Sequence, residues 1–371
     1  MARVRMILVG GFLGAGKTTL LARAAERLAT RGLRVGLITN DQAANLVDTE
    51  LLRQAGQEVR EVSGACFCCA FNELLSACDS LINLHHPDVI IGEPVGSCTD
   101  LSATVLQPIK QHCRDRFDLA PYSVLVDADW LVKSLQPVDD PDEANVRYIY
   151  RKQIEEADLI VLNKVDSLPA ERLMQSRSLL KRNFPAPEVI EMSALAGGGV
   201  DPWLDRMLVG GVAGQRIVEV DYGTYADGEA ALGWLNAAVE LSALAPVDWK
   251  EFALDFLART QAELGRVSGD IAHLKVLLIA EGGRLQASLT SSAGTPVMQG
   301  GLRAPSRDAT LVVNARVRIS PEQLKTVVEG CLQQAAAKTV AVNTSEISSF
   351  RPGRPVPVHR FSTVVNAAAG K

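Results

Sequence analysis

Short apolar runs alternate with amphipathic stretches through roughly the first 200 residues of the chain. The apolar runs predict strands buried on both faces, which is typical of a mainly parallel sheet covered by helices. The expected strands are Val4–Val9, Arg34–Thr39, Val59–Val62, Val89–Glu93, Ser123–Asp127, Leu159–Asn163 and Val189–Met192. The expected helices are Thr18–Thr30, Phe71–Leu84, Asn145–Glu156 and Ala170–Asn183. This alternation predicts an α/β fold for the amino-terminal part of the chain.

The pattern changes after the glycine-rich stretch "GGGVDPWLDRMLVGGVAGQ", and we place a domain boundary near Gly214. Beyond it, "GWLNAAVEL" fits a strand or a helix, and we expect a strand. The other expected elements are a helix at Asp248–Leu264, strands at His273–Ala280, Leu285–Thr290 and Thr310–Arg316, and a helix from Pro321 behind the cap Ser320. We expect a first domain at 1–214, a smaller C-terminal α+β domain at 215–345 and an extended proline-rich tail at 346–371.

Length and charge narrow the classes of function. At 371 residues the chain exceeds the roughly 250 residues that one core supports, which favours two domains. The net charge of −5 argues against a nucleic acid or an anionic membrane as partner. The start of the chain resembles a signal peptide, but its apolar run leads into glycines and Lys17, so we interpret it as a buried strand.

A phosphate-binding loop follows the first expected strand. The spacing Gly11-x4-Gly16-Lys17-Thr18 matches the P-loop pattern between a strand and a helix. Glycines let backbone amides approach phosphates, Lys17 would neutralise the β- and γ-phosphates, and the Thr18 hydroxyl would bind Mg²⁺. The residues expected to contact the nucleotide here are Gly11, Gly14, Ala15, Gly16, Lys17, Thr18 and Thr19. The loop predicts a nucleoside triphosphate site.

A second motif favours GTP over ATP. Asn163-Lys164-x-Asp166 ends an expected strand, where open α/β sheets bind ligands. An aspartate there accepts two hydrogen bonds from guanine, whereas adenine has no such donor pair. The following segment Ser193-Ala194-Leu195 is expected to back the base.

Carboxylates between these motifs are candidates for Mg²⁺ and water. Glu93 ends an expected strand, and the Gly96 amide is placed to sense the γ-phosphate; the alternative for Glu93 is a solvated loop residue. Asp41 and Asp48 follow the second expected strand and are placed to approach Mg²⁺, although either could instead cap a helix.

Three thiols stand together at Cys66-x-Cys68-Cys69, just before an expected helix. Seven cysteines, an odd number, do not suggest a disulfide framework, so we expect a cytoplasmic protein with a metal or redox cluster. A helix N-terminus should lower the thiol pKa values and favour ligation of a divalent metal such as Zn²⁺. Three thiolates leave one tetrahedral position open, and Cys98 is a candidate for it, unless Cys98 simply packs in the core.

The motifs together resemble the CobW-like metallochaperone GTPases, relatives of the urease and hydrogenase nickel-insertion GTPases. The matching stretches are "GGFLGAGKTTLL", "ND…D", "GACFCC", "GEPVG", "VLVDAD" and "ADLIVLNKVD", over about residues 4–210. The resemblance implies slow hydrolysis of GTP to GDP and phosphate, coupled to delivery of Zn²⁺, Co²⁺ or another transition metal. The implied partner is a client metalloenzyme or cofactor-assembly protein. Whether the protein also forms a homodimer is left open.

The chain departs from that family's pattern in three places. The family often has Gly-Glu where this chain has Ala43-Ala44, and Pro94-Val95 replaces the usual residues between Glu93 and Gly96. A histidine-rich stretch is also missing from a chain with five histidines. Two alternatives remain: a small-molecule kinase, which would have no use for the guanine and thiol motifs, and a GTP-regulated client-binding module with little turnover.

Overall fold

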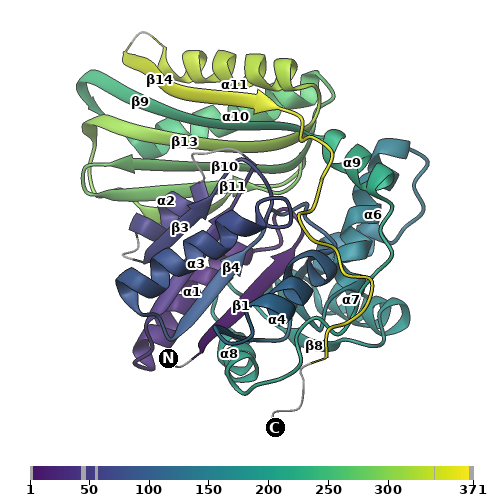
Figure 1. The fold of residues 1–371 in the computed structure, drawn as a ribbon. Coiled ribbons are helices and arrows are strands. Elements are labelled where there is room, and N and C mark those ends of the chain that lie inside the picture. Colours follow the sequence, from purple (N-terminus) through teal and green to yellow (C-terminus); the bar gives the residue numbers. More distant parts are fainter. Residues whose placement is uncertain (1–2, 43–46, 55–56, 338, 367–371) are drawn as a thin grey trace. The chain divides into compact units, whose positions relative to one another are not determined.

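The chain folds into two units, each assembled from separate stretches of sequence. The computed structural model describes residues 3–42, 47–54, 57–337 and 339–366. Unit 1 comprises residues 1–42, 52–228 and 354–371, and unit 2 comprises 43–51 and 229–353. The chain therefore leaves unit 1 briefly after its second strand and returns to it at the C-terminus, where the yellow trace in Figure 1 leaves β14.

Unit 1 is built on an eight-stranded sheet in which every strand pairing is parallel. Its strands are β1 (Val4–Gly11), β2 (Val35–Asn40), β3 (Glu58–Val62), β4 (Val89–Glu93), β5 (Phe117–Leu119), β6 (Ser123–Asp127), β7 (Leu159–Asn163) and β8 (Glu188–Glu191). The order is β3-β2-β4-β1-β6-β7-β8, with β5 also paired to β1. Because the strands are parallel, their carboxyl ends share one edge, and the order reverses at β1, where such sheets bind ligands.

Helices cover this sheet, and several have the caps that their sequences predict. The helical segments of unit 1 are α1 (Lys17–Thr30), α3 (Phe71–His85), η1 (Ser102–Leu106), α4 (Gln107–His112), α5 (Ala128–Ser134), α6 (Pro141–Glu155), η2 (Val165–Ser167), α7 (Ala170–Asn183) and α8 (Val200–Leu208); α2 (Val47–Gln54) and α9 (Tyr222–Ala230) span unit boundaries. The α6 helix starts earlier than expected, because Asp140 accepts hydrogen bonds from two amides of its first turn and Pro141 occupies the first position.

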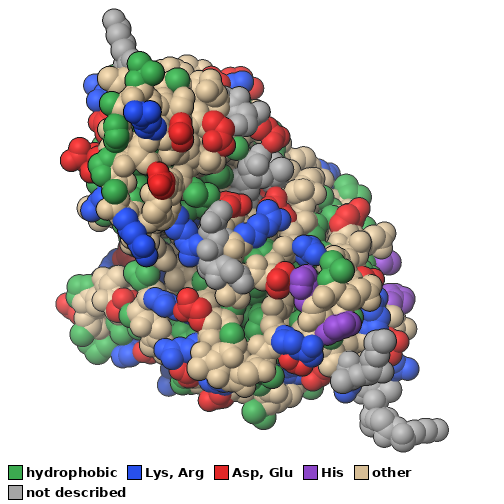
Figure 2. Space-filling view, turned by 90° about the vertical axis from the view of Figure 1, so that its left-hand side faces the viewer, with side chains coloured by type: hydrophobic (Ala, Val, Ile, Leu, Met, Phe, Trp, Pro, Cys, Tyr) green, Lys and Arg blue, Asp and Glu red, His purple; other side chains and the backbone are tan. Residues whose placement is uncertain are grey.

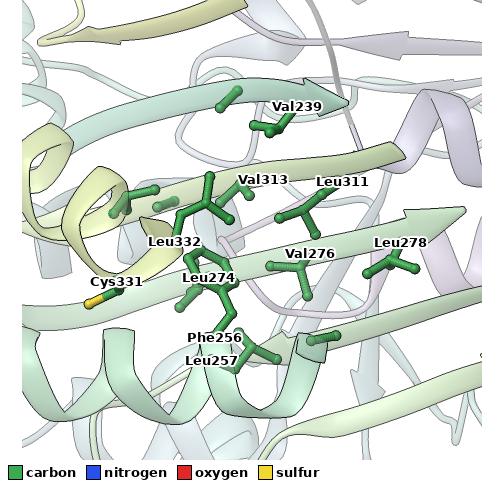
Figure 3. Close-up of a cluster of buried hydrophobic side chains, with 14 of the residues drawn as sticks. Val239, Phe256, Leu257, Leu274, Val276, Leu278, Leu311, Val313, Cys331 and Leu332 are labelled. Atoms are coloured by element: carbon green, nitrogen blue, oxygen red, sulfur yellow. The ribbon is translucent and has the colours of Figure 1, made fainter. Parts of the chain in front are cut away.

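Unit 2 is a six-stranded antiparallel sheet with two helices on one face. The sheet order is β12 (Val297–Gly301), β11 (Gly283–Leu289), β10 (Asp270–Ala280), β13 (Ser306–Arg318), β9 (Gly233–Val247) and β14 (Val340–Phe350). The helices are α10 (Trp249–Arg266), capped by Asp248, and α11 (Pro321–Ala336), capped by Ser320. Figure 3 shows α10 and α11 placing Phe256 and Leu332 against strand residues such as Val276.

The expected fold class is confirmed: a parallel P-loop-type α/β unit is joined to a smaller unit of antiparallel sheet and helices. The stretch "GWLNAAVEL" is a strand, part of β9. Strands β5, β12 and β14 and helices α2, α4, α5, α8 and α9 were not expected, and residues 346–350 of the expected tail form the end of β14.

The surface carries both signs of charge. On the face drawn in Figure 2, basic and acidic side chains are interspersed rather than gathered into a field of one sign. Opposite charges also pair in the exposed ion pairs Arg177–Glu191 and Arg259–Asp255. Among the described residues, every helix is too short or too polar to cross a membrane.

Candidate nucleotide and metal site

The glycines of the phosphate loop adopt backbone conformations that other residues rarely take. Gly11, Gly14 and Gly16 have φ angles of 128°, 75° and 98°. A Cβ on Gly16 would lie 2.4 Å from the Asn163 side-chain nitrogen, so the loop passes too close to β7 for any larger residue. Helix α1 begins at Lys17 directly after this turn, so the positive end of its dipole lies at the loop, where an anion is favoured.

Lys17 lies over its own loop. Its Nζ donates hydrogen bonds to the carbonyl oxygens of Gly11 at 2.9 Å and Phe12 at 3.3 Å. The same Nζ lies 3.9 Å from Glu93 Oε1, and a Cβ on Gly96 would lie 3.2 Å from it. The structure therefore brings together the lysine of the loop, the carboxylate that ends β4 and the glycine expected to sense the γ-phosphate.

Thr18 and Glu93 place two hard oxygens side by side. The Thr18 hydroxyl donates a hydrogen bond of 3.1 Å to Glu93 Oε1, and both side chains are buried. Oxygen ligands of this kind are those that Mg²⁺ takes in nucleotide sites. The donor set therefore fits Mg²⁺, and Glu93 is a buried residue at the nucleotide loop rather than a solvated one.

The guanine motif is tied to the phosphate loop through Asn163. Its side-chain nitrogen donates to the Ala15 carbonyl at 2.8 Å, and its Oδ1 accepts from the Ala194 amide at 2.9 Å. Lys164 has a φ of 62°, and its Nζ pairs with Asp127 Oδ2 at 2.7 Å. The next residues of the motif are accessible, because Asp166 in η2 is exposed and faces no burial cost in accepting a base.

The segment Ser193-Ala194-Leu195, which is expected to lie behind the base, is held by a turn of its own. The Ser193 hydroxyl accepts a hydrogen bond of 3.1 Å from the Ala196 amide, and the Ser193 amide donates to the Gly198 carbonyl at 2.9 Å. Leu195 is 43% exposed, so its side chain stands at the surface of the loop. The structure thus unites the three stretches expected to surround the guanosine.

One residue between the motifs holds the cysteine loop in place and was not expected from the sequence. Asn40, at the end of β2, donates to the carbonyls of Val62 and Ala65 and accepts from the Phe67 amide, each at 2.8 Å. It therefore fixes the cysteine loop from one side. The neighbouring Asp41 is buried, and its Oδ1 accepts from the Gln42 amide at 2.6 Å. The sequence feature that could have pointed to Asn40 is its position as a polar residue at the carboxyl end of a strand, next to the candidate carboxylate Asp41.

Cys66, Cys68 and Cys69 converge in space as their spacing predicts. Their sulfurs are separated by 2.9 Å for 66–68, 3.4 Å for 66–69 and 3.7 Å for 68–69. A tetrahedral zinc with bonds of about 2.3 Å spaces its sulfurs by roughly 3.8 Å, so a small expansion suits the ion. Cys66 and Cys68 are buried, and Cys69 is half-buried at the rim. Soft sulfur ligands at these distances fit Zn²⁺.

The expectation of lowered thiol pKa values is right for Cys66 and wrong for the other two. Hydrogen bonds from Cys68 first, then Cys69 and Cys98, lower the pKa of Cys66 well below its usual value. Hydrogen bonding with Cys66 raises the pKa of Cys68 well above its usual value and that of Cys69 to about 11. The cluster therefore favours ionisation of Cys66 over that of the other two thiols, because three adjacent sulfurs cannot all ionise without a cation.

Cys98 is buried next to the cluster. Its thiol hydrogen-bonds with those of Cys66 and Cys68, although it is not part of the set of three sulfurs that all lie within 4.8 Å of one another. Gln153, which the sequence did not single out, fixes its loop by donating to the carbonyls of Gly96 at 3.0 Å and Cys98 at 2.8 Å. The loop after Glu93 thus has a defined path from the phosphate loop to the thiols.

Asp48 has a different environment from the one expected. It lies in the part of α2 that belongs to unit 2, and it forms an ion pair with Lys275 of β10. The preceding Val47 amide donates to Asn314 Oδ1 at 2.7 Å. The departure Ala43-Ala44 lies outside the described residues, whereas Pro94 and Val95 are buried and the Val95 carbonyl accepts from the Cys98 amide at 2.9 Å.

The fold and the site define a P-loop nucleotide-binding protein that carries a thiol cluster. The family model for the CobW/HypB/UreG nucleotide-binding domain matches residues 5–190, half of the chain, and the chain belongs to this family.

The chain is also similar to proteins of known name. The zinc chaperone CobW of Pseudomonas aeruginosa is 28% identical over 217 residues, covering 52% of this chain and 57% of the relative. The zinc chaperone YjiA of Escherichia coli is 29% identical over 194 residues, covering 50% and 57%. The crystal structure of zinc-bound YjiA aligns with a TM-score of 0.36 at 17% identity, covering 89% of this chain and 99% of that one. The chain thus spans just over half the length of the curated relatives it matches.

Proposed function

We propose that the protein is a GTP-hydrolysing metallochaperone, which binds Zn²⁺ at its thiol cluster and transfers it to a client metalloprotein. The observation that carries the proposal is the shared edge of the parallel sheet in unit 1. The phosphate loop follows β1, Glu93 ends β4 and the cysteine loop follows β3, so all three leave the sheet at the carboxyl ends of its strands. The loop from Glu93 to Cys98 then joins the nucleotide side to the metal side.

Hydrolysis is assigned to the residues around the phosphate loop. Lys17 and the first amides of α1 bind the phosphate oxygens, while Thr18 and Glu93 would hold Mg²⁺, which supplies positive charge to the β- and γ-phosphates. Glu93 also orients the attacking water, because its buried carboxylate ends β4 beside Thr18 and Lys17. Asp166 selects guanine, and Asn163 keeps the base loop in register with the phosphates.

The cargo is assigned to the cysteines. Cys66 is the first ligand, because hydrogen bonds lower the pKa of its thiol, whereas the pKa values of Cys68 and Cys69 are raised and these thiols ionise as the ion binds. We assign Cys98 as the fourth ligand, for its thiol already bonds with two of the three others. Clustered free thiols belong in a reducing compartment, so we place the protein in the cytoplasm.

The test is a titration of Zn²⁺ or Co²⁺ against the GDP form and a form bound to a non-hydrolysable GTP analogue. A chaperone driven by nucleotide should bind metal with different affinity in the two forms, by about 5–150-fold, and phosphate release should need GTP rather than ATP. Cys66→Ser should lose metal binding, whereas Cys78→Ala, a change at a buried thiol on α3 outside the cluster, should keep it. Equal affinities in the two forms would reject coupling, and client binding without phosphate release would favour the GTP-regulated module.

A further inference from the structure

The last described residues of the chain return to unit 1 and run along it without helix or strand. Residues 354–366 follow β14, which belongs to unit 2, and they are the yellow trace that leads toward the C-terminus in Figure 1. The segment is proline-rich, with prolines at 355 and 357, so its backbone is already restricted to extended conformations. The conformational entropy lost when this segment becomes ordered is therefore small for a segment that lacks regular structure.

This segment, which we call the strap, lies directly on the thiol cluster. The Val356 amide donates a hydrogen bond of 3.2 Å to Cys69 Sγ, and the Val358 amide donates to the Cys68 carbonyl at 2.9 Å. Pro355 is buried, while the Val356 side chain is 74% exposed. The strap therefore meets the cluster through its backbone, and the side chain of Val356 contributes little to the contact.

Further contacts fasten the strap beyond the cluster. The His359 ring packs edge-on against Phe71, the first residue of α3, at 5.2 Å between centroids. The Phe361 amide donates to the Ala103 carbonyl at 3.1 Å, and the Val365 amide donates to Gln107 Oε1 at 2.8 Å. These bonds reach η1 and α4, so the strap is held along its length rather than at one point.

An ion pair connects the strap to the loop that carries Cys98. The Arg360 Nε donates to Asp100 Oδ2 at 2.7 Å, and Asp100 is 1% exposed with a φ of 65°. The Tyr222 hydroxyl donates to the same oxygen at 2.8 Å. Asp100 lies two residues after Cys98 on the segment that begins at Glu93, so a change in that segment on nucleotide exchange acts on the bond that holds the strap.

We propose that the strap is a built-in cover of the metal site: the Val356 amide supplies a hydrogen bond to the metal-bound Cys69 thiolate, and the strap must leave before metal passes to a client. The proposal rests on the proposed function and adds its regulation. Cys69 is the most exposed of the three clustered thiols, so an incoming ligand from a client must approach at this sulfur. The strap occupies that approach. A hydrogen bond from an amide stabilises a thiolate ligand, and loss of such outer contacts typically costs 10–100-fold in metal affinity.

The hydrogen bond is tested by removing one proton donor. Val356→Pro lacks the amide proton and keeps the extended backbone, because the residue already stands between two prolines. Val356→Ala keeps the amide and is the matched control. In the full chain, competition with a chromophoric chelator should show Zn²⁺ affinity 10–100-fold lower for the proline variant and unchanged for the alanine variant. Equal zinc affinities in the two variants would overturn the proposed role of the hydrogen bond in metal binding. This conclusion would hold whether or not the wild-type protein hydrolyses GTP.

The cover is tested by removing its ion pair. Arg360→Gln should raise hydrogen exchange at the amides of 356 and 358 and should speed zinc loss to the chelator several-fold, with GTP hydrolysis unchanged. Arg354→Gln removes the same charge from an exposed position of the strap and should change neither quantity. Identical exchange and transfer rates in both variants would overturn the cover. A wild-type chain that binds no zinc at its thiols would instead reject the proposed function, so the two failures are distinguishable.

Discussion

Thr18 and Glu93, 75 positions apart in the chain, are joined by a hydrogen bond from the threonine hydroxyl to Oε1 of the glutamate. The bond uses one carboxylate oxygen of a buried side chain. In the proposed mechanism Glu93 is positioned through Oε1 and acts on the attacking water through its other oxygen, so that nucleotide binding and hydrolysis depend on different atoms.

Glu93→Gln should therefore spare GTP binding and lose hydrolysis. The amide oxygen of glutamine still accepts the Thr18 hydrogen bond, but it carries no charge for Mg²⁺ or for a water proton. We expect single-turnover phosphate release to fall by about 10²–10⁴-fold, the usual contribution of a positioned general base. Lys17→Ala is the contrasting variant and should lose affinity and turnover together. Normal turnover in the glutamine variant would refute the catalytic role of Glu93.

Asp166→Ala should remove the preference for guanine. The exposed carboxylate is proposed to accept hydrogen bonds from the base, and bonds to a charged acceptor contribute about 1.5–3 kcal/mol. Fluorescent nucleotide titrations should show GTP binding weakened by that amount and ATP binding hardly changed. If the wild-type protein bound ATP and GTP equally, Asp166 would not be the selecting residue.

Zinc binding should release protons from the thiols. Hydrogen bonding with Cys66 raises the pKa of Cys68 well above its usual value and that of Cys69 to about 11, so both must lose a proton to become ligands. Affinity should therefore fall as pH falls. Calorimetry in buffers of different ionisation enthalpy counts the protons, and zinc binding without proton release would contradict ligation by Cys68 and Cys69.

Glu156 makes stability depend on pH. Complete burial raises its pKa, so the native state keeps a proton that the unfolded chain releases above a pH of about 4.3. Stability attributed to this group is present below that pH and is lost as pH rises toward the raised native pKa. Glu156→Gln keeps the acceptor for the Ser102 amide, which donates at 2.9 Å. Thermal unfolding should show the variant gaining stability over wild type at pH 7 and no gain near pH 4.

Asp158→Asn should have the opposite effect to Glu156→Gln and should destabilise the protein at pH 7. Asp158 accepts hydrogen bonds from the amides of Tyr122 and Gln215, each at 2.8 Å, and from the Gly214 amide. An asparagine must turn its NH₂ group toward at least one of these donors. Urea unfolding at pH 7 should give a loss of about 1–3 kcal/mol, the cost of a buried unsatisfied group. An unchanged midpoint would show that these backbone bonds add little to stability.

The parts of the site that the sequence predicts are those set by local spacing. The phosphate loop, the guanine motif and the cysteine cluster each need only neighbouring residues after a strand, and the structure places each of them after a strand, with the three sulfurs together. Asn40, Gln153 and Arg360 were not predicted, because each acts on a partner brought close by the tertiary path. The environment of Asp48 differs from the expected one for the same reason, because its partner Lys275 lies 227 positions away in the chain. Local periodicity carries no information on such pairs.

The order in which the chain is made gives the strap a further consequence. Cys69 and Val356 are 287 positions apart, so at synthesis rates of 5–20 residues per second the thiols precede their cover by about 15–60 s. During that interval the nascent chain already contains the phosphate loop and the cysteines, and the guanine motif is added within it, whereas the amides at 356 and 358 are still missing. A nascent chain thus presents a thiol cluster that the strap does not yet cover. The first metal ion to reach the cluster can bind before the strap has been synthesised.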